Sequence, residues 1–114
     1  MADESTLHRL YDQRLGKGPF PTAECAQAGI NGKLHMQLIL YVADVAGLAS
    51  RGEQGLATLS QEEKIKFRTL ISRNITEKSP ELRRKITPDA TPKLHALLDA
   101  TENARELILK ALDL

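Results

Sequence analysis

Pairs of histidine and aspartate are the first residues whose spacing could support chemistry. His8 and Asp12, and likewise His95 and Asp99, stand four positions apart, which places both side chains on one face of a helix. Each pair supplies two ligands, whereas a zinc site takes three or four. The chain has no His-Glu-x-x-His or Glu-x-x-His pattern, so zinc-protease and di-iron sites lack their ligands. We predict no metal site and no cofactor, and we interpret both pairs as solvated surface pairs.

Three further features are candidates for phosphate contact or nucleophilic catalysis. Residues 29–34 read Gly-Ile-Asn-Gly-Lys-Leu, but they lack the first glycine and the hydroxyl of a phosphate loop. They allow only a weak anion contact at a helix start. His35 shares a predicted helix face with Ile39 and Val42, so we interpret it as a largely buried structural histidine. Cys25 has no base beside it in the sequence and is interpreted as a plain thiol, buried or in a loop. We therefore predict no catalytic residue and no enzyme activity.

The charge distribution is the feature that favours a function. The net charge is +1, yet residues 64–93 alone carry nine basic and three acidic side chains. Such a segment attracts acidic proteins and nucleic acid, because lysine and arginine steer anionic partners and displace counterions from phosphate. We first interpret this segment as a solvated face that pairs with acidic residues such as Asp99, Glu102 and Glu106, and we keep two alternatives, an acidic protein partner and, after it, nucleic acid. The predicted partner-binding residues are Arg73, Lys78, Arg83, Arg84 and Lys85.

Residues 61–86 are predicted to form a helix, a short turn and a second helix, the order of a helix-turn-helix DNA-binding motif. The second helix is only about seven residues long, however, and its cations stand at its C-terminal end. A recognition helix contacts bases with its N-terminal residues, whereas cations at a C-terminus simply complement the helix dipole. This layout makes nucleic acid the less favoured partner.

The elements that position these residues are all predicted to be helical. Leucines recur at spacings of three and four, and no segment alternates apolar and polar residues as a half-buried strand does. Ser60 with Glu63 forms a capping box, and Asn31, Ser79 and Thr91 are predicted to cap helices with their side chains. The predicted helices cover residues 4–15, 32–49, 61–74, 80–86 and 92–113, and residues 16–31 form an irregular Gly/Pro-containing loop with one helical turn near 22–28.

These elements predict an all-α protein, a single-domain helical bundle of four main helices plus one short helix over residues 1–114. Leu38 and Val45 are predicted to be buried, and Phe67, Leu70 and Ile71 to face inward. The last helix has a wide apolar arc, which predicts a homodimer formed through that helix. No helix is apolar enough for a bilayer, and a single cysteine suits the reducing cytoplasm, so we expect a cytoplasmic protein without a membrane partner.

Taken together, the sequence predicts a non-enzymatic protein-interaction module, acting as a regulator, adaptor or assembly factor. This expectation rests on a compact helical fold combined with one basic segment. The alternative is a nucleic-acid-binding accessory protein that uses residues 64–93. A second alternative is an enzyme that contacts a small ligand or phosphate.

Overall fold

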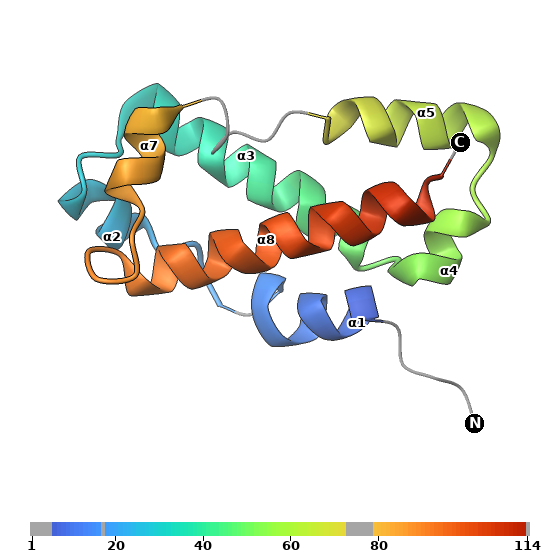
Figure 1. The fold of residues 1–114 in the computed structure, drawn as a ribbon, viewed down its shortest axis with the longest axis horizontal. Coiled ribbons are helices and arrows are strands. Elements are labelled where there is room, and N and C mark those ends of the chain that lie inside the picture. The colour runs from blue at the N-terminus through green and yellow to red at the C-terminus, as the bar shows by residue number, and fades with distance from the viewer. Residues whose placement is uncertain (1–5, 17, 73–78, 114) are drawn as a thin grey trace.

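The protein is all-α, as predicted. The computed structural model describes residues 6–16, 18–72 and 79–113, and no strand occurs within these ranges. Two long helices, α3 and α8, span most of the molecule side by side, with α2 and α7 at one end and α4 and α5 at the other (Figure 1). The elements are α1 (Thr6–Leu10), the π-helical turn η1 (Tyr11–Leu15), α2 (Thr22–Gln27), α3 (Gly32–Ala49), α4 (Gly52–Ala57), α5 (Gln61–Leu70), α7 (Pro80–Lys85) and α8 (Pro92–Ala111).

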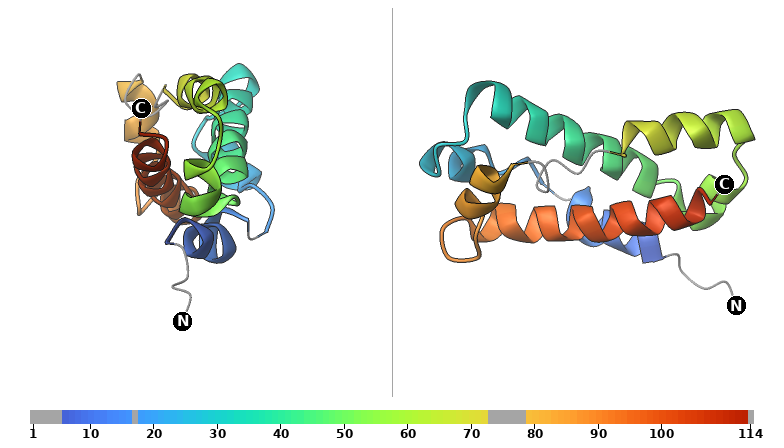
Figure 2. Two further views of the ribbon diagram at one scale, coloured as in Figure 1. Left: turned by 90° about the vertical axis from the view of Figure 1, so that its right-hand side faces the viewer. Right: turned by 45° about the horizontal axis from the view of Figure 1, so that its top comes forward.

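The core lies between α3, α8 and the N-terminal pair of α1 and η1, which contacts both long helices (Figure 2). Leu38 and Val45 of α3 are fully buried, which confirms their predicted placement. On α8, Leu94, Leu98 and Ile108 are buried at spacings of four and ten residues, so one stripe of the helix faces the core. Apolar side chains on two long helices thus bury each other within one chain.

The apolar arc of α8, which predicted a homodimer, is largely used inside the chain. Leu97, Leu107 and Leu109 pack partly buried against the core. Among the described residues, the large apolar side chains that are more than half exposed lie on helices other than α8. They are Met36, Leu40, Ile65 and Leu70. A homodimer through α8 therefore stays a prediction, and the exposed apolar surface lies on α3 and α5.

Several predicted helix boundaries are confirmed. Helix α3 spans the predicted residues, and α8 begins at Pro92, as predicted. The first helix ends at Gly16, but its second half is a π-helical turn in which the backbone N–H of Gly16 donates to the carbonyl of Tyr11 over 2.7 Å. The six-residue helix α4 was not predicted. Its two glycines, Gly52 and Gly55, give it a low intrinsic helix propensity, so its formation depends on packing of the buried Leu56.

The predicted caps are confirmed at two helix starts and wrong at two others. Ser60 Oγ accepts from the N–H of Glu63, and Ser79 Oγ accepts from the N–H of Leu82, each over 3.2 Å. Asn31 forms no side-chain capping bond. Thr91 also leaves its helix uncapped, because its buried hydroxyl instead bonds the backbone of Thr87.

Glu24 of α2 supplies the cap that Thr91 does not. Its Oε1 accepts from the N–H of Lys93 at 3.1 Å, and its Oε2 accepts from the N–H of Leu94 at 2.8 Å. A carboxylate at this position satisfies two unpaired donors of the first turn and complements the positive end of the helix dipole. The bond pair fixes the start of α8 against α2.

Helix α5 is held to the rest of the molecule by a few contacts, since none of its residues is buried. Phe67 lies half-buried beneath the guanidinium of Arg51, whose central carbon is 5.4 Å from the ring centroid. Just beyond the helix, Ile71 is buried, as predicted, whereas Leu70 is 51% exposed, so its predicted inward orientation is wrong. Arg105 of α8 completes the attachment by donating from Nε to the Ile71 carbonyl.

Candidate interaction site on α7

The predicted partner-binding residues that the structure describes stand on α7. Ser79 caps this six-residue helix and Pro80 occupies its first turn, a position where the missing N–H costs nothing. A single helix this short is unstable alone. Two buried apolar side chains, Leu82 and Ile86, attach it to the core. The anchoring holds the neighbouring cations in a defined place on the surface.

The three adjacent cations of α7 have three different environments. Lys85 is half-buried, and its Nζ lies 3.3 Å from Glu81 Oε1 on the same helix. Arg83 is exposed at the edge of a pocket next to α8. Arg84 is also exposed, and none of the described residues forms a hydrogen bond or ion pair with its side chain. Successive residues of a helix are about 100° apart, which explains why the three side chains diverge.

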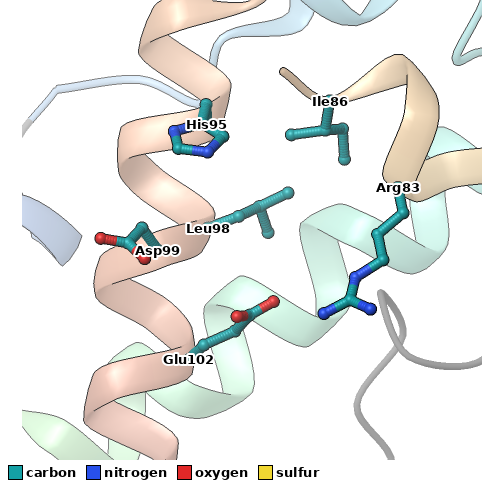
Figure 3. Close-up of a pocket in the computed structure, with 6 residues that line it drawn as sticks. All are labelled: Arg83, Ile86, His95, Leu98, Asp99 and Glu102. Atoms are coloured by element: carbon teal, nitrogen blue, oxygen red, sulfur yellow. The ribbon is translucent and has the colours of Figure 1, made fainter. Parts of the chain in front are cut away.

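The pocket beside Arg83 has a volume of about 280 Å³. Its apolar wall is formed by Ile86 of α7 and Leu98 of α8 (Figure 3). The guanidinium of Arg83 and the carboxylate of Glu102 extend into the space between the two helices, whereas the carboxylate of Asp99 points to the other side (Figure 3). Arg83 of the basic segment and Glu102 of α8 thus line one pocket, whereas Arg84 does not line it.

Two of the predicted binding residues, Arg73 and Lys78, lie outside the described residues. The other cations of the basic segment on α5 are Lys64, which is half-buried, and Lys66 and Arg68, which are exposed. Glu62 and Glu63 stand in the first turn of the same helix. This helix thus presents a mixed surface, whereas the single carboxylate of α7, Glu81, pairs with Lys85 and leaves two exposed arginines on the same helix.

Histidine and carboxylate side chains meet at the pocket next to α7. His95 and Asp99 line it together, but the described part of the chain contains no group of three or more histidine, cysteine or carboxylate side chains able to hold a metal ion. Two ligands do not complete a zinc site. The arrangement of the Arg83 guanidinium, the His95 imidazole and the Glu102 carboxylate beside an apolar wall instead suits hydrogen bonding and charge pairing with a polar partner.

Cys25 and His35 contribute to the packing of α2 and its loop. The Cys25 thiol is buried, and burial together with the nearby Glu24 carboxylate raises the pKa of the thiol above its ordinary 9.0. A thiol held in its protonated form is a poor nucleophile. His35 is half-buried rather than largely buried, so that prediction is wrong in degree. Its Nε2 lies 3.2 Å from Thr22 Oγ1, and its ring contacts Phe20.

A second hollow, opposite the α7 pocket on α8, was not foreseen from the sequence. It brings Arg14 and Phe20 next to Lys93 and Leu97. The first two residues are more than seventy positions away from the last two in the sequence. The sequence signal was limited to the Gly-Pro-Phe-Pro run at residues 18–21, which marks a rigid loop. Neither periodicity nor capping indicates which helix face lies opposite that loop.

No helix in the described ranges is both long and apolar enough to cross a membrane. Comparison with family models, with curated proteins and with solved structures gives no match for this chain.

Proposed function

We propose that this chain is a non-enzymatic protein-interaction module that binds an acidic segment of a partner protein through Arg83 and Arg84. The observation that carries the proposal is the exposed Arg84 on an anchored helix, with no hydrogen bond or ion pair to the described residues. A guanidinium presents five donors in a planar fork that matches a carboxylate. Because Leu82 and Ile86 fix the helix, binding costs little additional ordering of the backbone.

An acidic protein is favoured over nucleic acid for three reasons. Helix α7 has six residues and carries its cations in its last turn, away from the end that a recognition helix inserts into a groove. The exposed cations of α5 share their helix with Glu62 and Glu63, which weakens attraction to phosphate. None of the four aromatic side chains lies on α7 or lines the pocket beside it, so the cations of α7 have no neighbouring ring on which bases stack. We also place the module in a reducing compartment, the cytoplasm, since its one cysteine is free.

The test compares proteins retained from a lysate of the source cells by three tagged forms. These are the wild type, the double variant Arg83→Glu/Arg84→Glu, and the matched control Lys66→Glu/Arg68→Glu, which changes the net charge equally on α5. We expect the wild type and the α5 control to retain a partner that has an acidic segment, and we expect the α7 variant to lose it. Retention of the same proteins by all three forms would overturn it.

Stability measurements on the same variants separate binding from folding. Charge reversal at two exposed positions should change the free energy of unfolding by about 0.5 kcal/mol or less per site. A loss above about 2 kcal/mol in the α7 variant, without loss of a partner, would instead make the cluster structural.

A further inference from the structure

A second hollow lies between the Gly/Pro-containing loop and the first half of α8. It has a volume of about 570 Å³, within the range of roughly 300–1,000 Å³ typical of ligand sites. Phe20, Ala96 and Leu97 give it an apolar lining, and Pro19 and Pro21 stand on either side of Phe20. The hollow is an open groove, so it suits an extended segment better than an enclosed small molecule.

The loop wall of this groove is rigidly supported. Proline fixes its own φ angle, so Pro19 and Pro21 restrict the backbone around Phe20. The Phe20 ring packs edge-on against His35 of α3 with centroids 5.7 Å apart, and the same imidazole lies 3.2 Å from the hydroxyl of Thr22. His35 therefore acts as a positioning residue for the wall. A preformed site lowers the entropic cost of binding.

The opposite wall is fixed as well. The Glu24 carboxylate holds the first turn of α8 through the N–H groups of Lys93 and Leu94. Those two donors are occupied, so the helix start itself offers no free amides there for an anion. Attraction of a ligand must come from the side chains that line the groove.

The charges that line the groove are both positive. Among the described lining residues, Arg14 and Lys93 are the charged ones, and neither forms an ion pair with another described residue. Both side chains are exposed, which leaves them able to reach a ligand that sits over Leu97. An apolar floor flanked by two cations favours a partner that combines carboxylates with an apolar side chain.

We infer that this groove is a docking site for an acidic peptide segment that carries a large apolar side chain. The apolar side chain packs on Phe20 and Leu97, while carboxylates on either side of it meet Arg14 and Lys93. The groove is lined by Lys93, Ala96 and Leu97 of α8, whereas the α7 pocket is lined by His95, Leu98, Asp99 and Glu102. At about 100° per residue these two sets lie on opposite sides of α8. The inference thus stands independently of the proposed function of α7.

The experiment measures fluorescence anisotropy with three labelled peptides, each about eight residues long. The first has Leu-Phe at its centre and glutamates on both sides, the second replaces Leu-Phe by Ser-Ser, and the third replaces the glutamates by lysines. We expect the first peptide to bind at least ten times more tightly than the other two at physiological salt. Equal binding of all three, or no binding of the first at millimolar protein, would overturn the inference.

Variants then assign the binding to the groove. Arg14→Glu/Lys93→Glu and, separately, Leu97→Lys should each weaken binding of the first peptide at least ten-fold, whereas Lys110→Glu near the far end of α8 should change it less than two-fold. Melting curves of all variants confirm folding, and the amide chemical shifts of Thr22, Ala23 and Ala96 provide a readout in the wild type itself. Unchanged shifts at these amides on saturation, or tighter binding of a labelled DNA duplex that the same double variant abolishes, would overturn the assignment.

Discussion

The carboxylate of Glu24 accepts a hydrogen bond of 2.8 Å from the backbone N–H of Leu94, seventy positions further along the chain. This contact replaces a local cap by a tertiary one. It joins the short helix α2 to the longest helix of the fold, and it fixes the wall of the groove that contains Lys93. One carboxylate therefore links helix stability to the geometry of a candidate site.

Removal of this cap is predicted to destabilise the protein. Glu24→Ala should lower the free energy of unfolding by about 1–2 kcal/mol, because two first-turn N–H groups lose their acceptor and the helix dipole loses its counter-charge. Urea denaturation measures the change. The matched control is Glu81→Ala, which removes only the surface pair with Lys85 and should cost about 0.5 kcal/mol or less. Equal losses for the two variants would contradict the capping role.

Apart from α4, the helices were predictable from the sequence because their signals are local. The capping box at Ser60, the Ser79-Pro80 pair and the glycines after η1 all act within a few residues. Thr91 failed as a cap because its hydroxyl bonds the turn at Thr87 while Glu24 arrives from another helix. That competition is a tertiary effect, which no local pattern indicates.

The candidate sites were predictable to different degrees. The exposure of Arg83 and Arg84 follows from their charge and from the surface position of a short capped helix. The groove was not predictable, because Arg14 and Lys93 come together only when η1 and α8 pack against the core. The orientation of Leu70 was mispredicted for a related reason. Because α5 buries none of its own residues, the spacing of its apolar residues does not indicate which face of the helix points toward the core.

Two leucines of α3 provide a sharp test of the core. Leu38 is fully buried and Leu40 is 56% exposed. Leu38→Ala should cost about 2–5 kcal/mol through lost burial and a residual cavity, while Leu40→Ala should cost about 0.5 kcal/mol or less. Thermal and chemical denaturation of the two variants measure the loss of stability for the same substitution at two positions of one helix. Similar melting temperatures for the two variants would show that α3 is rotated from the position described.

Arg105 is predicted to stabilise the attachment of α5. Its guanidinium donates to the carbonyls of Ile71 and Ser72 over 2.7 and 3.0 Å, a fork that lysine cannot reproduce. Arg105→Lys should therefore speed hydrogen exchange of the α5 amides several-fold while leaving exchange in the middle of α3 unchanged. NMR or mass spectrometry measures the exchange rates. Unchanged slow exchange of the α5 amides in the variant would show that Phe67 and Ile71 alone hold α5 in place.

Asp44 is predicted to make stability depend on pH. Burial raises the pKa of this carboxyl above its ordinary 3.8, so the folded state favours the protonated form and ionisation opposes folding. The cost is absent below the unfolded-state pKa and appears as pH rises through the folded-state pKa. Asp44→Asn should accordingly melt at a higher temperature than the wild type at about pH 7, and the two should converge near pH 3. A constant difference across this range would contradict the assignment.

The outer face of α3 is a second candidate for self-association, besides the predicted face of α8. Met36 and Leu40 are 54% and 56% exposed and lie four residues apart on this helix, next to the exposed Ala43. Apolar side chains this exposed gain burial in a two-fold contact. Light scattering should give a mass twice 12.6 kDa for the wild type and a monomer for Met36→Asp/Leu40→Asp. A monomeric wild type across micromolar concentrations would contradict a dimer, and an unchanged dimer in this variant would assign it to another face, such as that of α8.

The central claim is that the arginines of α7 bind acidic protein rather than nucleic acid, and a salt titration with a labelled DNA duplex tests it most directly. The wild type and Arg83→Glu/Arg84→Glu are titrated between about 50 and 300 mM salt, with labelled polyglutamate as the parallel probe. We expect the wild type to bind polyglutamate and the double variant to lose this binding. We also expect the dissociation constant for the duplex at about 150 mM salt to be no tighter than the roughly 10⁻⁴–10⁻⁶ M of non-specific contact. Submicromolar affinity for the duplex, lost in the double variant, would contradict it.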